Sequence, residues 1–284
     1  MKDFTGRYCI INNQTETTDS LNKNFPTSSV IFYEVIRVID GVLLFLEDHL
    51  KRLDNSVKKY KNDYTIDYEY LKEVLLKLLI KNDLHIGNIK LLVFFDPDGK
   101  EPLKTIAHQV LHSYPSDKLY HKGIRTSLYF VERKNPNIKA FNIPLQEKCR
   151  TTITDQKLYE VLLVDHNGYV TEGSKSNVFF IQKGSLLTPP FDRVLKGITR
   201  EKVMDICKST QCDLKEENIA VKRLSSFDAA FITGTSSKIL PVASINDITY
   251  EANHPLTGHI KTHYDRMIED YIMKVRQKGY QTAL

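Results

Sequence analysis

A single carboxylate at the end of an apolar strand is the feature that most limits what this chain can be. The stretch Tyr169-Val-Thr-Glu-Gly-Ser-Lys-Ser-Asn-Val-Phe-Phe180 places Glu172 there, and small turn-forming residues follow it before the next apolar run. An isolated Thr-Glu-Gly is as often a turn or a cap as a functional site. A pattern as dense as this one rarely comes from packing alone, so we expect Glu172 to serve chemistry.

Composition bounds the class of protein. The 284 residues, 41% apolar and 26% charged, are normal for a soluble globular protein with one large or two ordinary domains. The 40 basic and 35 acidic residues are spread along the whole chain, which argues against a nucleic-acid-binding tail. No apolar run approaches the roughly 20 residues of a membrane span, and the N-terminus lacks a secretory pattern. The four cysteines form no C-x-x-C motif, so we expect a cytoplasmic protein.

The N-terminal part shows the spacing of a sheet covered by helices. Val30 to Phe45 is rich in β-branched and aromatic residues and is broken by Asp40-Gly41, which is typical of a hairpin turn. Apolar residues recur at helical spacing in Glu47–Tyr60 and Tyr68–Ile80. The remaining expected elements are a surface loop at Asn12–Asn24 and two strands, Asn88–Asp96 and Thr105–Leu111, around a turn at Asp96-Pro-Asp-Gly99.

A domain boundary is expected near Ser113–Lys118, where turn formers and charges cluster without periodicity. We therefore predict an N-terminal α/β domain over 1–115 and a C-terminal α+β domain over 116–284. Strands and helices alternate irregularly in the second part, which favours α+β layers over a repeating βαβ sheet. Its expected elements are strands at Ile124–Glu132, Glu160–Asp165 and Asp228–Ile232, and helices at Pro144–Leu158, from Gly197 to about Lys208, and at Leu256–Lys278.

Several short motifs occur in one order along about three quarters of the chain, and together they are far more specific than any one of them. They are Tyr33-Glu-Val-Ile-Arg37, His49-Leu-Lys-Arg-Leu53, Asn137-Ile-Lys-Ala-Phe-Asn142, the Glu172 stretch, Gly197-Ile-Thr-Arg200 and Gly234-Thr-Ser-Ser237. In this order the chain resembles the fold-type IV, pyridoxal-phosphate-dependent aminotransferases. The resemblance implies a two-domain α+β enzyme like the D-amino-acid aminotransferases, with pyridoxal 5'-phosphate (PLP) at the domain junction and a homodimeric state.

The resemblance assigns the Schiff-base lysine to Lys139, because a lysine followed by two residues and an asparagine occurs in several branches of the family. Chemistry on an aldehyde cofactor needs such an amine, and a partly desolvated lysine loses its proton readily, which arginine does not. Without the resemblance, Lys139 would be one solvated surface lysine among many. Lys134 and Lys148 are its nearest competitors.

The resemblance also assigns cofactor contacts. Glu172 would hold the protonated ring nitrogen, which lets the ring accept electrons. A helix N-terminus presents backbone N–H groups and a partial positive charge to a phosphate, and Gly197-Ile-Thr fits such a start or an ordinary cap. The expected cofactor contacts are Arg52, Lys139, Glu172, Asn177, Ile198, Thr199 and Thr235.

Substrate identity follows less directly. Tyr33 and Arg37 are expected to line the pocket, and Thr235 and Ser236 to give N–H groups to the substrate carboxylate. The Arg-x-His trap of the D-amino-acid branch is missing from Lys90-Leu-Leu-Val-Phe-Phe95, which counts against D-substrates. An apolar pocket with Tyr33, Phe94 and Phe95 would suit an aliphatic side chain. We therefore expect transfer between an L-branched-chain amino acid and a 2-oxo acid, by resemblance 2-oxoglutarate.

Alternatives stay open within and outside the family. The motifs are shared with aminodeoxychorismate lyases and D-amino-acid aminotransferases, and a catalytically silent binding module is a remote third possibility. A basic helix at Lys51–Lys61 is interrupted by acidic residues and has no stacking aromatics, so nucleic-acid binding is poorly motivated. His254, His259 and His263 lack accompanying acidic or cysteine ligands, so we expect no metal site. From the charge distribution and the absence of a long apolar run, we expect no nucleic-acid or membrane partner.

Overall fold

The computed structural model describes residues 4–23, 30–62, 64–96 and 102–279, and this part of the chain divides into two compact units. Unit 1 consists of Met1–Ser113 together with two later segments, Ile138–Phe141 and Ile268–Leu284. Unit 2 consists of Tyr114–Asn137 and Asn142–Met267. The four residues around Lys139 therefore belong with the N-terminal part of the chain, although they lie far from it in the sequence.

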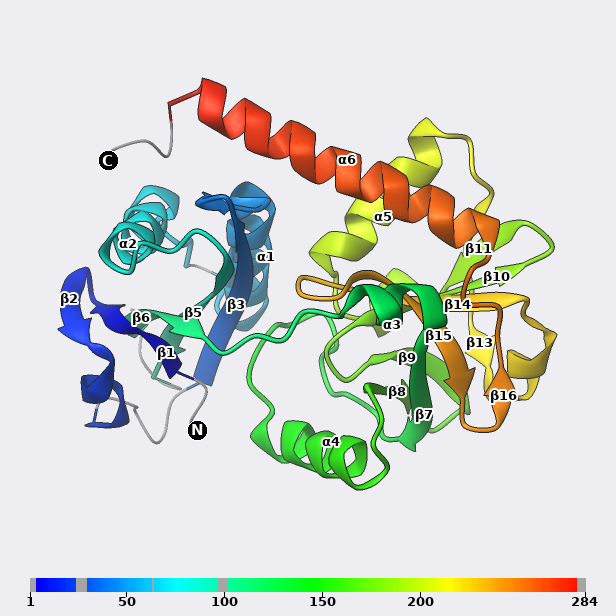
Figure 1. The fold of residues 1–284 in the computed structure, drawn as a ribbon. Coiled ribbons are helices and arrows are strands. Elements are labelled where there is room, and N and C mark those ends of the chain that lie inside the picture. The colour runs from blue at the N-terminus through cyan, green and yellow to red at the C-terminus, as the bar shows by residue number, and fades with distance from the viewer. Residues whose placement is uncertain (1–3, 24–29, 63, 97–101, 280–284) are drawn as a thin grey trace. The chain divides into compact units, whose positions relative to one another are not determined.

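Unit 1 is built on a six-stranded sheet with the order β2-β1-β6-β5-β3-β4, in which all neighbours are antiparallel (Figure 1). The predicted hairpin at Asp40-Gly41 is confirmed, because these two residues take positive φ angles of 51° and 74° between β3 and β4. The strands are β1 (Phe4–Ile11), β2 (Gln14–Thr17), β3 (Val30–Ile39), β4 (Val42–Leu43), β5 (Gly87–Phe95) and β6 (Pro102–Val110).

The expected surface loop at Asn12–Asn24 is wrong for most of its length. Asn12 and Asn13 take positive φ angles of 45° and 63°, which asparagine tolerates better than most residues, and they turn the chain back into β2. A 3₁₀ helix, η1 (Thr18–Lys23), follows. The predicted turn at Asp96-Pro-Asp-Gly99 falls largely outside the described residues.

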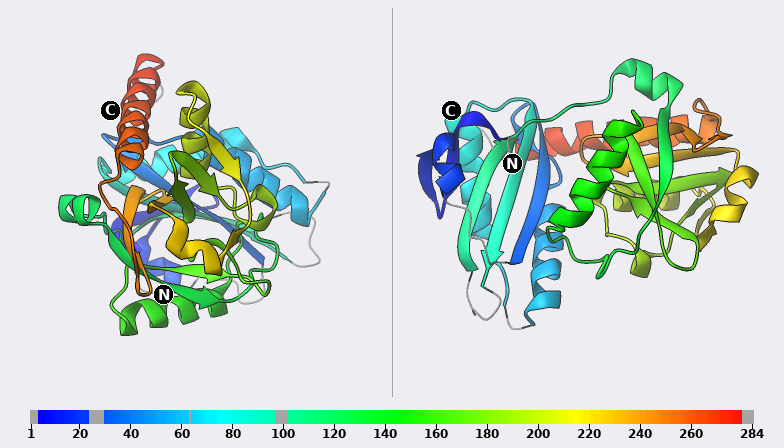
Figure 2. Two further views of the ribbon diagram at one scale, coloured as in Figure 1. Left: turned by 90° about the vertical axis from the view of Figure 1, so that its right-hand side faces the viewer. Right: turned by 90° about the horizontal axis from the view of Figure 1, so that it is seen from below.

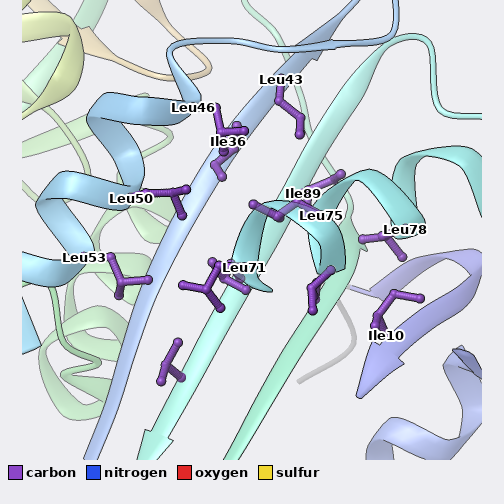
Figure 3. Packing of buried hydrophobic residues seen from close by; sticks show 14 of the residues in the cluster. Ile10, Ile36, Leu43, Leu46, Leu50, Leu53, Leu71, Leu75, Leu78 and Ile89 are labelled. Carbon is purple, nitrogen blue, oxygen red and sulfur yellow. The ribbon is translucent and has the colours of Figure 1, made fainter. Parts of the chain in front are cut away.

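Two helices, α1 (Leu46–Tyr60) and α2 (Tyr68–Lys81), cover one face of this sheet. Their leucines point into a core shared with the strands (Figure 3). The labelled members of this core are Ile10, Ile36, Leu43, Leu46, Leu50, Leu53, Leu71, Leu75, Leu78 and Ile89. Both helices were predicted from apolar spacing, and the packing shows why: each lays one apolar stripe on the sheet.

Helix α1 also carries a second buried stripe that is polar. His49, Arg52 and Ser56 are spaced by three and four residues, so they lie on one side of the helix, and they are only 2%, 8% and 1% exposed. The helix begins without a side-chain cap at Phe45; the hydroxyl of Tyr271 instead accepts a hydrogen bond from the Leu46 N–H at 3.1 Å. We call His49, Arg52 and Ser56 the polar stripe of α1.

Unit 2 contains a ten-stranded mixed sheet with the path β12-β11-β10-β14-β15-β7-β8-β9-β13, and β16 pairs with β15. Pairs β11–β12, β15–β7 and β7–β8 are parallel, so the sheet is not a repeating βαβ unit. The strands are β7 (Ile124–Phe130), β8 (Glu160–Val164), β9 (Tyr169–Gly173), β10 (Asn177–Gln182), β11 (Ser185–Thr188), β12 (Leu214–Glu216), β13 (Ile219–Ala220), β14 (Ala229–Gly234), β15 (Lys238–Ile245) and β16 (Ile248–Thr249).

Three helices of unit 2 occur where they were predicted, with small differences at their ends, whereas α3 (Asp117–Lys122) was not predicted and overlaps the expected domain boundary. Helix α4 ends at Asp155 rather than Leu158, because Lys157 takes a positive φ of 52°. This helix lies beside β8 (Figure 2), and its buried Cys149 packs there against Val161 and Leu163. The segments are α3 (Asp117–Lys122), α4 (Ile143–Asp155), η2 (Phe191–Arg193), α5 (Ile198–Ser209), η3 (Val221–Ser226) and α6 (Pro255–Gln277), whose last turns belong to unit 1. Among the described residues, no helix is long and apolar enough to cross a membrane.

Candidate active site

The segment that carries Lys139 is held in unit 1 by main-chain hydrogen bonds to strand β3. The N–H of Tyr33 donates to the Lys139 carbonyl at 3.2 Å, and the N–H of Phe141 donates to the Ile31 carbonyl at 3.0 Å. The four residues Ile138–Phe141 thus run along β3 as a short extra strand. The asparagine that ends the motif, Asn142, then caps α4 by accepting a hydrogen bond from the Leu145 N–H at 3.2 Å.

The side chain of Lys139 lies among aromatic rings. Its Nζ is 4.5 Å from the centre of the Tyr33 ring, which lies 4.3 Å from the ring of Phe141. A second amine, Nζ of Lys90, lies 4.7 Å from the Phe141 ring and 5.7 Å from the Tyr33 ring. Lys90 was not singled out from the sequence as a site residue, and a lone cation within an apolar strand gives only a weak signal.

Arg52 belongs to a buried ionic group. Its Nε and Nη2 donate to the two oxygens of Glu34 at 2.8 and 2.5 Å, and Nδ1 of His49 lies 2.7 Å from the same carboxylate. Burial alone would raise the pKa of Glu34, but the charge and hydrogen bonds of Arg52, with the His49 hydrogen bond, lower it to about 2. Burial lowers the pKa of His49, which favours the neutral imidazole. The carboxylate thus fixes the plane of the guanidinium.

Ser56 joins Arg52 to the Lys139 segment. Its hydroxyl donates to the Arg52 carbonyl at 2.9 Å and accepts from the Lys139 N–H at 3.2 Å. Neither Ser56 nor Glu34 was predicted to be a site residue. Two patterns could have indicated them: the helical spacing of the polar stripe of α1, and the place of Glu34 among the buried alternate residues of β3.

The other residues expected at the substrate pocket point to different faces of the sheet, because side chains alternate along a strand. Tyr33 and Arg37 are four positions apart on β3, so both point to the face opposite α1 and α2, and both are half-buried. Phe94 clusters on that face with Tyr33, whereas Phe95 packs in the helix-facing core, 5.7 Å from Phe32 in ring-centre distance. Phe95 was therefore wrongly expected beside Tyr33.

Glu172 lies in unit 2 near the end of β9 and is 3% exposed. Its Oε1 accepts a hydrogen bond from Nη1 of Arg133 at 2.9 Å, and its Oε2 accepts one from the Leu195 N–H at 3.0 Å. These two donors hold the carboxylate through both of its oxygens. Arg133 was missed in the sequence because it lies far from Glu172 along the chain.

The peptide of Leu195 connects two of the predicted residues. Its N–H bonds to Glu172, and its carbonyl accepts a hydrogen bond from Nδ2 of Asn177 at 2.9 Å. A side-chain carbon at Gly197 would lie 1.9 Å from Oδ1 of Asn177, so close approach, and not an unusual φ, requires glycine there. The side chain of Asn177 is therefore hydrogen-bonded to the loop that leads into α5.

Helix α5 begins at Ile198 with Gly197 as N-cap and no capping side chain. The first N–H groups of a helix have no partner within the helix and carry partial positive charge. Ile198 and Thr199 are buried, and the Thr199 hydroxyl lies 3.3 Å from the hydroxyl of Tyr264. Arg200 is 2% exposed and donates to the Pro189 carbonyl at 3.1 Å, which ties the start of α5 to the preceding loop.

Two turns complete the residues of interest in unit 2. Thr235 and Ser236 are half-buried in the turn between β14 and β15, whose ends pair as Gly234 with Lys238. The turn after Glu172 is gathered by Glu160, a carboxylate that is 4% exposed. Glu160 accepts hydrogen bonds at 2.6–3.2 Å from N–H and hydroxyl groups of Val161, Ser174, Lys175 and Ser176.

Comparison with known proteins decides the family. Residues 31–245 match the sequence model of the family described as amino-transferase class IV. The chain belongs to the class IV aminotransferases. It is 31% identical over 224 residues to a putative branched-chain-amino-acid aminotransferase of Methanocaldococcus jannaschii, covering 75% of this chain and 78% of that one. It is 29% identical to the D-alanine aminotransferase of Bacillus licheniformis, with 81% and 84% covered.

Solved structures show the same fold. The branched-chain amino acid aminotransferase of Escherichia coli superposes with a TM-score of 0.81 at 24% identity, covering 93% of this chain and 95% of that one. A putative 4-amino-4-deoxychorismate lyase of Legionella pneumophila reaches 0.77 at 22% identity, with 87% and 97% covered. The predicted family and α+β fold are confirmed, and this class IV aminotransferase is an enzyme.

The structure also describes the cysteines and histidines that the sequence analysis set aside. Burial raises the pKa of Cys149 to about 11 and, with Cys212 beside it, that of Cys207 to about 12, so neither thiol is activated. The rings of His259 and His263 lie 4.4 Å apart on α6. Over the described ranges, no group of three or more His, Cys, Asp or Glu residues could hold a metal ion.

Proposed function

We propose that this class IV aminotransferase uses PLP to move an amino group from an L-branched-chain amino acid to a 2-oxo acid. The observation that carries the proposal is the anchoring of Lys139, whose peptide is bonded to β3 and α1 while its amine lies beside Tyr33. A lysine held by its backbone among aromatic rings is a suitable amine for linkage to an aldehyde. The solved holo-form of a Thermobaculum terrenum relative contains PLP, which supports the cofactor.

The residues present fit PLP. Arg52 and the N-terminus of α5 are suited to a phosphate, because the first offers a buried guanidinium and the second offers N–H groups of Ile198 and Thr199. Glu172 is a buried carboxylate suited to a protonated ring nitrogen. The position of the cofactor at the domain junction stays a prediction from the sequence.

When bound, PLP would supply a ring that accepts the electrons left when the substrate α-proton departs. In this proposal Lys139 takes that proton from the α-carbon and returns it to the cofactor side, as a general base and then a general acid. Glu172 keeps a proton on the ring nitrogen, and Arg133 and the Leu195 N–H hold its carboxylate in place. Tyr33 and Phe141 exclude water from the amine.

Thr235 and Ser236 are proposed to orient the substrate carboxylate through their backbone N–H groups, and Tyr33 and Arg37 to line the pocket. The aliphatic specificity is supported by the relatives named as branched-chain enzymes and by the apolar cluster of Phe94 with Tyr33. For the acceptor we propose 2-oxoglutarate, whose second carboxylate could pair with the amine of Lys90 beside Phe141.

A D-amino-acid aminotransferase is the second candidate, because the D-alanine enzyme of Bacillus licheniformis is similar over 84% of its length. The absent Arg-x-His trap favours L-substrates. For lyase activity, the support is the fold shared with a putative 4-amino-4-deoxychorismate lyase at 22% identity, which is a likeness of fold alone. The homodimeric state and the cytoplasmic location remain predictions from the sequence.

The direct test is an amino-transfer assay with purified protein, added PLP and 2-oxoglutarate, in which L-leucine, D-alanine and aminodeoxychorismate are compared. We expect L-glutamate to form with L-leucine at a kcat/KM at least tenfold above that with D-alanine. Faster turnover of D-alanine, or pyruvate release from aminodeoxychorismate without amino transfer, would contradict the substrate assignment.

A further inference from the structure

The polar stripe of α1 is more than a helix needs in order to cover a sheet. Leu46, Leu50 and Leu53 already supply the apolar packing, whereas Arg52 and Ser56 bring polar atoms into the interior. Burying a polar group costs free energy unless the group is hydrogen-bonded, so we ask which partner each of these side chains binds. For Arg52 that partner is Glu34, and for Ser56 it is the backbone of Lys139.

Ser56 has a geometry in which its hydroxyl uses both donor and acceptor capacity. The hydroxyl proton goes to the Arg52 carbonyl, one turn earlier in α1, at 2.9 Å. A lone pair then accepts the Lys139 N–H at 3.2 Å. Since the Lys139 carbonyl accepts the Tyr33 N–H, the residue is held from two sides, by β3 and by α1.

We propose that Ser56 is a positioning residue that fixes the backbone of Lys139 and thereby the place from which its amine reaches the cofactor aldehyde. The inference rests on the proposed function, in which Lys139 forms the covalent link to PLP. Ser56 does not touch the cofactor in this account; it acts through Lys139. Removing its hydroxyl leaves the Lys139 N–H without its acceptor and frees the segment on the α1 side.

The test compares two ligands that share ring and phosphate. PLP has the aldehyde that links to a lysine, whereas pyridoxamine 5'-phosphate has an amine there and cannot link. We expect Ser56→Ala to weaken PLP binding about tenfold, the loss of one buried hydrogen bond, and to change the Kd of pyridoxamine 5'-phosphate by less than about twofold. Ser56→Thr, which keeps the hydroxyl, should retain most of the wild-type affinity for PLP.

Thr126→Val is the matched control. Thr126 is 1% exposed in unit 2, and its hydroxyl donates to the Ser244 carbonyl at 3.0 Å, so the change also removes one buried hydroxyl hydrogen bond. It should leave both dissociation constants within about twofold of the wild type. If Ser56→Ala does not fold, Ser56→Cys gives the same comparison, because a thiol of similar size is a poor hydrogen-bonding group.

Equal weakening of both ligands in Ser56→Ala would show a general structural role and overturn the proposal, as would no weakening of either. The proposed function fails in a different way. If the wild type binds PLP no better than pyridoxamine 5'-phosphate, or if borohydride fixes PLP to another lysine, the covalent role of Lys139 is wrong and the inference falls with it.

Discussion

The two units hold their proposed site residues by different physical means. In unit 1 the support of Arg52 is ionic: its guanidinium is oriented by Glu34, a carboxylate that is fully buried and also bound to His49. In unit 2 a main-chain group is central: the peptide of Leu195 lies between Glu172 and Asn177, and Arg133 adds one ion pair to Glu172. A buried ionic support is sensitive to charge and pH, whereas a main-chain support is sensitive to side-chain size and hydrogen-bonding pattern.

The largest effect is expected at Lys139 itself, where the supports of unit 1 converge. Lys139→Arg keeps a positive charge but cannot readily lose a proton, so kcat should fall by roughly 10³-fold or more. Lys134→Arg is the matched control, since Lys134 is exposed and five positions earlier, and its kcat should not change. Steady-state kinetics with L-leucine checks both. A Lys139→Arg enzyme within tenfold of the wild type would contradict the assignment.

Removing the buried Glu34–Arg52 ion pair of unit 1 should lower the stability of the protein more than any single change in the main-chain support of unit 2. Glu34→Gln leaves the Arg52 charge buried without its carboxylate, so we expect the free energy of unfolding to fall by about 3–5 kcal/mol. Urea unfolding followed by circular dichroism measures it. A loss under about 1 kcal/mol would show that the pair is not a structural support.

The same carboxylate gives unit 1 a predictable acid sensitivity. Its pKa is lowered from 4.5 to about 2, so its contribution to stability is fully present above the unfolded pKa and is lost as pH falls through the folded one. The wild type should therefore lose this stability as the pH falls from roughly 5 to 2, and Glu34→Gln should lack that part of the pH dependence. Unfolding at several pH values tests it; parallel pH profiles for the two proteins would contradict it.

The main-chain support of unit 2 should fail through one hydrogen bond. Asn177→Asp cannot donate to the Leu195 carbonyl and places a carboxylate beside it, so the loop entering α5 should shift. We expect PLP affinity to fall by about 1–3 kcal/mol, with a smaller loss for pyridoxal, which lacks the phosphate. Asn253→Asp is the exposed control. Equal losses of affinity for PLP and pyridoxal would contradict a role of Asn177 in phosphate binding.

The smallest effect concerns substrate choice. Lys90→Met keeps the length of the side chain near Phe141 but removes its charge, so it should raise the KM for 2-oxoglutarate about threefold to tenfold. The KM for the oxo acid of leucine, which has no second carboxylate, should stay within about twofold. If the KM values of both acceptors rise together, Lys90 supports the pocket without reading the second carboxylate.

Predictability from the sequence followed the same division between the units. In unit 2 the candidate residues themselves lie in short motifs: Glu172 and Asn177 share one, and Gly197 with Thr199 forms another, so they could be selected from the sequence. Yet Asn177 contacts the Leu195 carbonyl and the α5 entry loop, and local sequence could not reveal that role. The predicted helix start at Gly197 is confirmed.

In unit 1 the important contacts join residues that are far apart. Ser56 and Lys139 are 83 positions apart, and Arg133 and Glu172 in unit 2 are 39 apart, so neither pair leaves a local pattern. Glu34 could have been recognised as buried from strand alternation, because it lies between the buried Phe32 and Ile36. Strand alternation also places the neighbouring Phe94 and Phe95 on opposite faces of the sheet, so the sequence itself could have shown that only one of them accompanies Tyr33.

The central claim is the proposal that Lys139 carries the covalent link to PLP and that Glu172 holds the ring nitrogen of the cofactor. Borohydride reduction of the PLP-loaded protein followed by peptide mapping tests it most directly, with Glu172→Gln in parallel and the visible spectrum recorded before reduction. The account predicts that the label lies on Lys139 in both proteins and that the bound-cofactor absorbance and its pH dependence change in Glu172→Gln. A label on another lysine, or identical spectra at every pH, would contradict it.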